Sequence, residues 1–446
     1  MKELSLHDRI IYHRAVEAVI WAMPLMNSAG MRQALIDAGA NIHDVGYFNP
    51  MQDWRCQYAT ANNTTPYVGF YANVKDGPVV VEIPKSAADV GIFGTVMDFW
   101  NRPLADVGAA GRDRGAGANY LFVHKDYQGP LPLGGYVIVE SRSYNIWGCL
   151  RPVIKDASQE SLDKAEAFVR KIRIFPLAKA DNPPEVQYVN LYGKMVNAIP
   201  TYDASFFERL HGLIQEEAVD EKDHIMMGML KTLGIEKGVP YKVDPKCKAI
   251  FDQAAKEALQ YMIELYHTRA IPPFYEGKKW TSILPAGTLE TKFSLQFPTY
   301  SDYESHGILY YAVTTSVEFY GAASFYLSVA KDAQDRWLDG GKNYTLTVPP
   351  NAPARDFWSI ILYNLETASY IKQVPKLGVA SSDEGLQTNP DGSVSLYFGP
   401  TAPKRKEANW APTKAGERWF CLFRFYGPEP AARDKSWQLD DFELVE

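Results

Sequence analysis

Cysteine is scarce in this chain of 446 residues, and the four that occur, Cys56, Cys149, Cys247 and Cys421, are far apart in the sequence. A structural zinc site needs closely spaced Cys or His ligands, and neither the cysteines nor the eight histidines show that spacing. We therefore predict no metal-ligating residues and expect four free, buried thiols. A metal site whose ligands come from distant strands stays an alternative. Disulfides stay an alternative, whose pairing the sequence cannot supply.

Long hydrophobic runs are also missing. The best candidate for a membrane span, residues 15–26, is interrupted by Glu17 and Pro24. The first nine residues carry Glu3 and Asp8 and lack the apolar stretch of a signal peptide. We expect a soluble protein without a membrane span, cytoplasmic as written, or periplasmic or secreted if a leader has been removed.

No long basic stripe occurs, although residues 404–406 (KRK) form a short basic loop. The formal net charge is −7, the sequence pI is about 5.7, and Lys and Arg are spread along the chain. Nucleic-acid binding normally requires a basic stripe that displaces counterions from phosphates. We therefore expect no nucleic-acid partner.

Motifs of several common enzyme classes are absent. The chain has no GxSxG nucleophile elbow, no HExxH zinc motif and no phosphate-binding P-loop. Residues 328–331 match SxxK, but the companion motifs of that enzyme class are missing. The missing motifs argue against an α/β-hydrolase, an HExxH zinc enzyme and a P-loop nucleotide-binding enzyme. The sequence does not identify a cofactor.

Aromatic residues are abundant, at 13% of the chain, which favours β-rich folds because flat rings pack well on pleated surfaces. The length fits two domains. Helical periodicity covers about 6–38 and 203–270, with start signals at Asp203 and at Asp244-Pro245. Period-two segments occupy most of the rest and resume from about residue 306.

These segments define four parts of the chain. We predict an N-terminal helical segment over 1–59, a first β-sandwich over 60–200, a helical connector over 201–279 and a second β-sandwich over 280–446.

A weak internal duplication relates the two β regions. Residues 80–84 (VVEIP) correspond to 346–349 (LTVP), and 147–151 (WGCLR) correspond to 420–424 (FCLFR), with offsets near 270 and the same order along the chain. We therefore predict a mainly β protein with a helical insert. It would be built as a double jelly roll, two similar antiparallel jelly-roll-like sandwiches joined by the helical connector.

Specific stretches within these regions resemble a known family. They include residues 62–67 (NNTTPY), 106–108 (DVG), 344–351 (YTLTVPPN), 409–413 (NWAPT) and 424–428 (RFYGP). The chain resembles the tandem family of bacterial domains of unknown function numbered 1254 in the N-terminal half and 1214 in the C-terminal half.

The resemblance covers nearly the whole chain and implies a double jelly roll with a helical connector, but little about activity. Many relatives look exported. This sequence has Asn63-Thr64-Thr65 where relatives have an Asn-Asp-Thr type of motif, so any role for an acid there is absent.

The candidate chemistry centres on Asp98, which lies between Met97 and the aromatic pair Phe99-Trp100. An inward-facing acid there needs a partner or a raised pKa, and a raised pKa suits proton transfer near neutral pH. A solvent-facing Asp98 is the alternative. Asn62 and Asn63, in a loop of small polar residues, are the other predicted catalytic residues, although a simple turn network would also explain that loop.

Further residues are predicted to bind substrate. In the first β region they are the polar or aromatic residues beside Asp98 and the loop, and arginines that could bind a carboxylate of a ligand or, as the alternative, of the protein itself: Thr64, Tyr67, Trp100, Arg142 and Arg151. At the junction before the second β region they are residues that could hold an anion or serve as an interdomain clasp: Arg269, Tyr275 and Lys278.

Two functions are compatible with these features. One is an enzyme acting on a small carboxylate- or ester-bearing molecule, a hydrolase or lyase with acid/base chemistry by Asp98. The other is a non-catalytic ligand-binding or oligomeric assembly protein. In either case we expect a small-molecule ligand and a homo-oligomer, because the many aromatic residues and the long helical insert leave apolar surface to cover.

Overall fold

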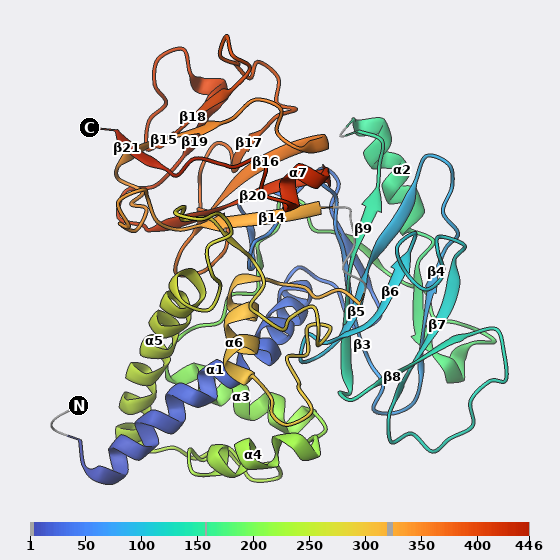
Figure 1. Cartoon of the computed structure of the whole chain (residues 1–446). Coiled ribbons are helices and arrows are strands. Elements are labelled where there is room, and N and C mark those ends of the chain that lie inside the picture. Colours follow the sequence, from blue (N-terminus) through green and yellow to red (C-terminus); the bar gives the residue numbers. More distant parts are fainter. Residues whose placement is uncertain (1–3, 157, 319–323, 446) are drawn as a thin grey trace. The chain divides into compact units, whose positions relative to one another are not determined.

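The computed structural model describes residues 4–156, 158–318 and 324–445 (Figure 1). Its contacts divide the chain into two units. The first unit comprises Met1–Gln52, Asn63–Met262 and Gly287–Phe319, and the second comprises Asp53–Asn62, Ile263–Ala286 and Tyr320–Glu446. Several β-sheets dominate the structure, so the prediction of a mainly β protein with helical parts is confirmed.

The first unit contains a six-stranded sheet in the order β11-β1-β3-β9-β5-β6 and a four-stranded sheet in the order β10-β4-β7-β8. Their side chains form one hydrophobic core, in which Val81 of β4 and Phe122 of β7 join Phe70 of β3 and Leu150 of β9. The strands of this unit are β1 (Val45–Tyr47), β3 (Val68–Asn73), β4 (Val79–Ile83), β5 (Gly91–Asp98), β6 (Pro103–Gly108), β7 (Ala118–His124), β8 (Val137–Ser141), β9 (Asn145–Val153), β10 (Arg173–Pro176), β11 (Tyr188–Asn190) and β12 (Val196–Asn197).

The second unit repeats this arrangement with a five-stranded sheet, β13-β14-β20-β16-β17, and a four-stranded sheet, β19-β18-β15-β21. Its core is rich in aromatic residues, including Trp280, Trp419 and Phe423. The strands are β2 (Cys56–Gln57), β13 (Thr281–Ser282), β14 (Ser324–Val329), β15 (Asn343–Val348), β16 (Ala354–Asn364), β17 (Gly378–Ala380), β18 (Val394–Gly399), β19 (Trp410–Pro412), β20 (Trp419–Pro428) and β21 (Glu443–Val445).

Strand pairing confirms the internal duplication. The order β3-β9-β5-β6 of the first unit corresponds to β14-β20-β16-β17 of the second, and β10-β4-β7-β8 corresponds to β21-β15-β18-β19. Even the parallel pair β7–β8 has a parallel counterpart in β18–β19. Most other pairs are antiparallel, as predicted, although β1–β11 is also parallel. The finer prediction of a jelly roll is not established by these pairings and stays a prediction.

The helices largely follow the sequence signals. The predicted helices at 6–38 and 203–270 are confirmed, with Asp203 capping the first helix of the second stretch and Pro245 beginning its last. The helices are α1 (Leu6–Asp37), α2 (Gln159–Val169), α3 (Ala204–Glu216), α4 (His224–Lys231), α5 (Pro245–Thr268), α6 (Tyr303–Ala312) and α7 (Pro430–Arg433), with short 3₁₀ turns η1 (Leu177–Lys179), η2 (Glu221–Asp223) and η3 (Glu407–Asn409).

The helix α6 corrects the expectation that residues from about 306 are β. Asp302 caps this helix by accepting a hydrogen bond from the Ser305 backbone N–H at 2.9 Å. Its residues from Gly307 to Ala312 are all buried. A helix that is apolar all round has no amphipathic period, so its sequence cannot be told from a buried strand.

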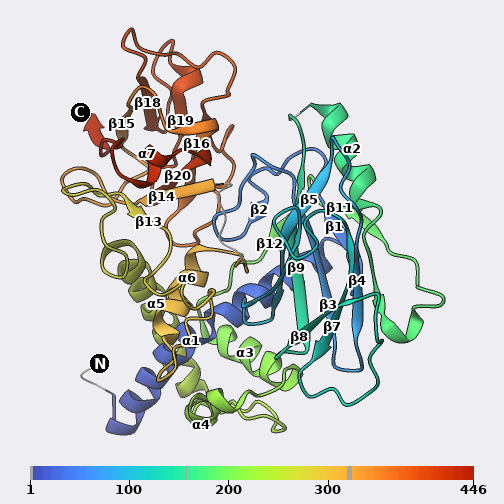
Figure 2. The same ribbon diagram turned by 45° about the vertical axis from the view of Figure 1, so that its right-hand side comes forward.

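The helix α1 packs against α3, α4 and α6 within the first unit (Figure 2). It continues through Pro24, which has no N–H to donate to the carbonyl of Ile20. Gly307 of α6 lies against that carbonyl, and a Cβ on Gly307 would lie only 2.3 Å from the Ile20 oxygen. Close approach of α1 and α6 therefore depends on this glycine.

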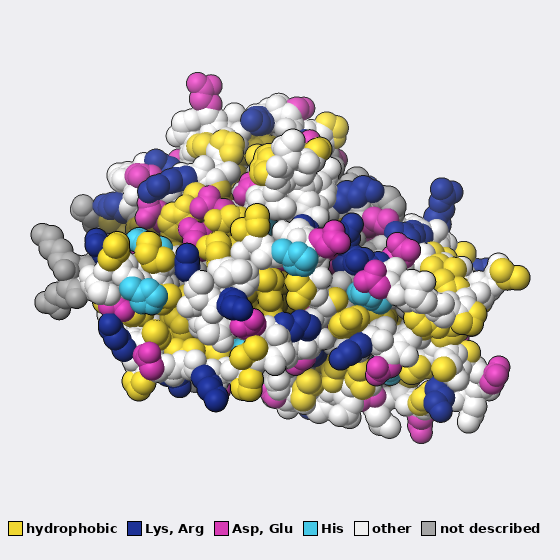
Figure 3. All heavy atoms as spheres, turned by 90° about the horizontal axis from the view of Figure 1, so that it is seen from below, with side chains coloured by type: hydrophobic (Ala, Val, Ile, Leu, Met, Phe, Trp, Pro, Cys, Tyr) yellow, Lys and Arg dark blue, Asp and Glu magenta, His cyan; other side chains and the backbone are white. Residues whose placement is uncertain are grey.

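The cysteines are free, as predicted, but only Cys56 and Cys421 are buried, whereas Cys149 and Cys247 are partly exposed. None of the helices within the described ranges is long and apolar enough to cross a membrane. On the face drawn in Figure 3, basic and acidic side chains are interspersed.

Candidate functional site

A small cavity of about 30 Å³ lies within the first unit. Its walls include Trp21 of α1, Trp100 and Arg102 of the turn between β5 and β6, Lys222 of η2 and His306 of α6. Four segments that are distant in the sequence therefore contribute polar and aromatic side chains to one cavity.

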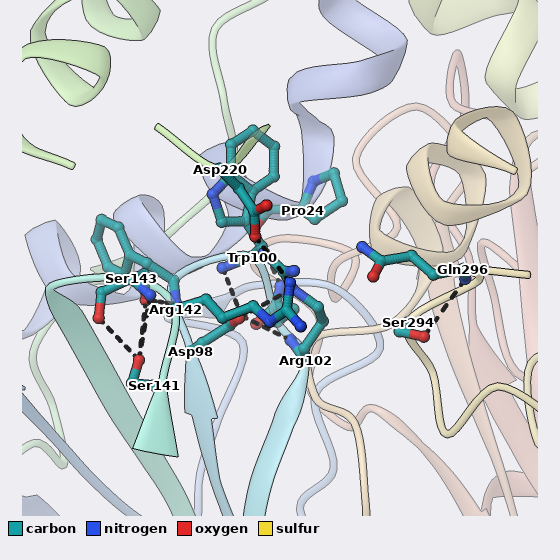
Figure 4. A network of polar contacts seen from close by, with 12 residues as sticks. Pro24, Asp98, Trp100, Arg102, Ser141, Arg142, Ser143, Asp220, Ser294 and Gln296 are labelled. Atoms are coloured by element: carbon teal, nitrogen blue, oxygen red, sulfur yellow. Dashed lines mark hydrogen bonds and ion pairs between the residues drawn. The ribbon is translucent and has the colours of Figure 1, made fainter. Parts of the chain in front are cut away.

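Asp98 is the last residue of β5 and lies beside this cavity (Figure 4). Both of its carboxylate oxygens have polar contacts within the protein. Its Oδ1 accepts hydrogen bonds from the backbone N–H groups of Trp100 at 2.8 Å and Arg102 at 2.9 Å. Its Oδ2 lies 2.9 Å from Nε of Arg102. Asp98 is 2% exposed and Arg102 8% exposed, so this is a buried ion pair. The predicted inward orientation of Asp98 is thus found, and its partner is Arg102.

Asn101 fixes the turn that carries Asp98 and Arg102. It is fully buried and adopts a positive φ of 58°, a conformation that Asn tolerates better than most residues. Its Oδ1 accepts from Ser28 Oγ at 2.9 Å and Trp147 Nε1 at 3.1 Å, and its backbone carbonyl accepts from the Tyr310 hydroxyl at 2.8 Å. The sequence analysis missed Asn101, and the available signal was an Asn at the end of a strand just before Arg102-Pro103.

Three buried nitrogen atoms at the cavity have no hydrogen-bond partner among the described residues: Nη1 and Nε of Arg102 and Nε2 of His306. Of these, Nε is ion-paired with Asp98. Burial, followed by repulsion from Arg102 and Lys222, holds the pKa of His306 well below its usual value. The imidazole is therefore neutral at physiological pH. Its ring meets Tyr310 edge-on, with 5.2 Å between ring centroids.

Lys222 and Asp223 line the cavity on the η2 side. Lys222 remains exposed, yet partial desolvation and repulsion from Arg102 lower its pKa to about 8. Desolvation raises the pKa of Asp223. Both shifts move these groups towards titration near neutral pH.

Two other predicted residues belong to this region. The Trp100 ring packs against Trp21, with 4.6 Å between ring centroids. Arg142 lies outside the cavity walls and pairs with Asp220 at 3.1 Å, just before η2 (Figure 4). The structure therefore brings Trp100 beside Asp98 and links Arg142 to the segment that carries Lys222.

The predicted loop residues lie elsewhere. Asp98 pairs with Ile146 of β9, whereas the guanidinium of Arg151, five residues further along β9, lies 4.9 Å from the Tyr67 ring. That separation is roughly 17 Å along a strand. Tyr67 and the half-buried Asn63 and Thr64 just before it are therefore near the opposite end of the sheet from Asp98, and the structure does not bring that loop and Asp98 together.

The remaining predicted residues belong to the second unit. Asn62 is buried there, and its Nδ2 donates to the Tyr426 hydroxyl at 3.0 Å. Arg269 pairs with Glu264 on the surface, and Lys278 pairs with Asp440 at 3.0 Å. Tyr275 is fully buried in the hydrophobic core of this unit. None of these four lines the cavity of the first unit.

No group of three or more His, Cys, Asp or Glu side chains that could hold a metal ion occurs in residues 4–156, 158–318 and 324–445. The polar groups at the cavity suit an organic ligand with oxygen acceptors, because the groups there without a hydrogen-bond partner among the described residues include guanidinium nitrogens of Arg102.

Two family models match the chain, in the expected order. The model described as "Protein of unknown function (DUF1254)" matches residues 43–176, and the one described as "Protein of unknown function (DUF1214)" matches residues 323–430. The chain belongs to this tandem family. The DUF1254 match includes Asp98 and Arg102, whereas Trp21, Lys222 and His306 lie outside both matches.

One of two similar solved structures shares the fold of this DUF1254–DUF1214 chain. The VPA0106 protein from Vibrio parahaemolyticus matches with a TM-score of 0.56 and 17% identity, covering 98% of this chain and 100% of that one. An uncharacterised protein from Burkholderia cenocepacia matches with a TM-score of 0.42 and 14% identity over 98% of this chain and 94% of that one. Among curated proteins, none matches.

Proposed function

We propose that the first unit binds a small molecule through a carboxylate or ester oxygen that accepts a hydrogen bond from Arg102. The observation that carries this proposal is the buried Nη1 of Arg102, which lines the cavity and has no acceptor among the described residues. Leaving a buried donor without an acceptor costs about 1–3 kcal/mol. A ligand oxygen would recover that free energy.

Asp98 acts in this proposal as a positioning residue. The contact of its carboxylate with Nε of Arg102 holds the guanidinium in one orientation. In that orientation Nη1 has no acceptor among the described residues. Because both Asp98 oxygens are already hydrogen-bonded or ion-paired, the original hypothesis of acid/base chemistry by Asp98 has less support than ligand binding by Arg102. Trp21 and Trp100 offer an apolar wall for the rest of the ligand.

A second candidate function is a hydrolase or lyase acting on the same class of molecule. The observation that favours it is Lys222, whose pKa of about 8 leaves a useful fraction of free amine near neutral pH. The neutral imidazole of His306 adds a hydrogen-bonding group at the cavity. In this scheme Arg102 binds the carbonyl oxygen of an ester, and the free amine of Lys222 takes a proton from the water that attacks the carbonyl carbon. The amine then returns the proton to the departing alkoxide, so that acid and alcohol are released.

Calorimetric titration with short monocarboxylates and their methyl esters tests binding. We expect at least one to bind the wild-type chain, and Arg102→Met to weaken that binding by at least tenfold, the loss of one charged hydrogen bond. Arg112→Met is the matched control, since Arg112 pairs with Glu318 at 2.8 Å away from the cavity walls. Absence of binding, or equal binding by Arg102→Met, would refute the proposal.

Product release from the methyl esters tests catalysis separately. Lys222→Met should abolish turnover while ligand binding persists. If the wild-type chain binds an ester but never hydrolyses or eliminates it, the first unit is a binding module for that ligand class.

The homo-oligomer is also a proposal, supported by the edge strand β8. This strand ends its sheet, and it exposes 43% of Ile138, while Leu133 just before it is fully exposed. Exposed apolar edge strands pair readily with a second copy. Light scattering should show a dimer or larger species that Ile138→Lys converts to a monomer, and a monomeric wild-type chain at micromolar concentration would oppose it.

A further inference from the structure

Arg424 is a buried arginine without a counter-ion among the residues that the structure describes. It lies in β20 of the second unit and is only 2% exposed. No carboxylate within the described ranges forms an ion pair with it. Because arginine remains protonated in proteins, the burial of a full positive charge here needs compensation.

The printed contacts of Arg424 satisfy only part of the guanidinium. Nη2 donates to the Tyr363 hydroxyl at 2.6 Å and to the Thr60 carbonyl at 3.3 Å. The guanidinium also lies 5.3 Å from the ring of Tyr326 and 5.6 Å from that of Tyr363. Nη1 has no hydrogen-bond partner in the described parts of the chain.

Two further buried donors are close to Arg424. Ser359 of β16 lies directly opposite it in the sheet register, so the two side chains leave the sheet on the same face. Tyr370 stacks on Tyr363 with 5.7 Å between ring centroids. The hydroxyl groups of Ser359 and Tyr370 are also buried without partners among the described residues. One positive charge and two hydroxyl groups, each able to donate a hydrogen bond, thus gather where no carboxylate among the described residues balances the charge.

The duplicated sandwich of the first unit shows that the architecture does not require this cluster. There Arg151 of β9 likewise lies over a tyrosine, Tyr67, at 4.9 Å. The residue opposite Arg151 on the neighbouring strand is Phe93, which cannot donate a hydrogen bond. Arg151 is also partly exposed. The second unit alone combines full burial with an added hydroxyl opposite the arginine.

We propose that Nη1 of Arg424, Oγ of Ser359 and the hydroxyl of Tyr370 together bind a small monocarboxylate. One negative charge balances the guanidinium, and two carboxylate oxygens supply the acceptors that the donors lack. Full burial limits the ligand to the size of formate or acetate. This site lies in the second unit and is independent of the ligand proposed for Arg102.

The test is carbon-13 NMR of the full chain dialysed against labelled formate. A buried site exchanges slowly, so bound formate should give a resonance separate from the free ion. We expect that resonance to disappear in Arg424→Gln and to persist in Arg102→Met. Arg151→Gln, at the corresponding position of the first sandwich, is the matched control and should retain it.

Single-donor variants keep the test decisive if Arg424→Gln does not fold. Ser359→Ala and Tyr370→Phe retain the charge, and each should weaken formate binding by about fivefold or more. The proposal is overturned if no bound resonance depends on Arg424, or if both single-donor variants bind like the wild-type chain. Displacement of formate by an equal concentration of chloride would also overturn it, since the site would then select only for charge.

Discussion

Oδ2 of Asp98 lies 2.9 Å from Nε of Arg102, and both side chains are buried at the end of the first sandwich. The pair links the stability of the turn between β5 and β6 to the direction in which the guanidinium faces the cavity. The pair is thus proposed to stabilise the turn and to orient Arg102 for ligand binding. These two roles can be separated, because stability and ligand binding are measured independently.

Asp98→Asn should lower the stability of the first unit by about 3 kcal/mol, because it leaves the Arg102 charge buried without a partner. The melting temperature, followed by circular dichroism, should fall by several degrees. Lys164→Met is the control, since Lys164 and Asp89 form an exposed pair at 3.1 Å whose loss should cost less than about 1 kcal/mol.

Removing both charges extends this prediction. Asp98→Asn combined with Arg102→Met should recover part of the lost stability, because no unpaired charge remains. A double variant as unstable as the sum of the two single variants would show that the ion pair is not the coupled unit proposed.

Substitutions of Asn101 should separate its backbone conformation from its hydrogen bonds. Asn101→Gly and Asn101→Ala both lose the side-chain contacts, but only alanine is strained at φ 58°. We expect the alanine variant to be less stable than the glycine variant by about 1 kcal/mol in denaturant melts. Equal stability would mean that the turn relaxes out of this conformation.

Gly307→Ala should destabilise the contact between α1 and α6 by about 2 kcal/mol or more, since the new Cβ would approach the Ile20 carbonyl to 2.3 Å. Gly212→Ala is a matched control in the exposed middle of α3, where a Cβ meets nothing within 4 Å. That control should gain about 0.5–1 kcal/mol from helix propensity. A neutral Gly307→Ala would contradict the close packing of the two helices.

The pH dependence of stability should report Lys222. Its pKa is about 8 in the folded chain and ordinarily 10.5, so the unfolded chain binds more protons between these values. The contribution of Lys222 to the free energy of unfolding therefore rises as the pH increases from about 8 to 10.5. Because Lys222 is exposed, solvent screening keeps the effect small, and only its sign is predicted.

Lys222→Met should remove this rise, whereas Lys171→Met, at an exposed position on the surface, should preserve it. Melting temperatures at pH 7.5 and pH 10 give the comparison. An identical pH response in wild type and Lys222→Met would show that the amine titrates as it does in the unfolded chain.

The sequence determined the features that depend on neighbouring residues. The helical spacing of apolar residues and the capping residues located α1, α3 and α5, because helical hydrogen bonds and caps involve residues close in the sequence. Asp203 caps α3, for example, and Pro245 begins α5. Repeated strand patterns revealed the duplication, since two sandwiches with the same strand order must alternate their side chains in similar ways.

Only the tertiary structure decided what those side chains meet. In its strand, Arg424 points to the face of the sheet opposite to that of Phe423 and Phe425, which lie in the hydrophobic core. The alternation of side chains along a strand predicts which face a residue occupies, but not what covers that face. Likewise, Asp98 was expected to face inward or outward, and its partner four residues later depended on a turn fixed by Asn101. The cavity brings Trp21, Lys222 and His306 together from separate segments, because packing free energy depends on contacts that no sequence window contains.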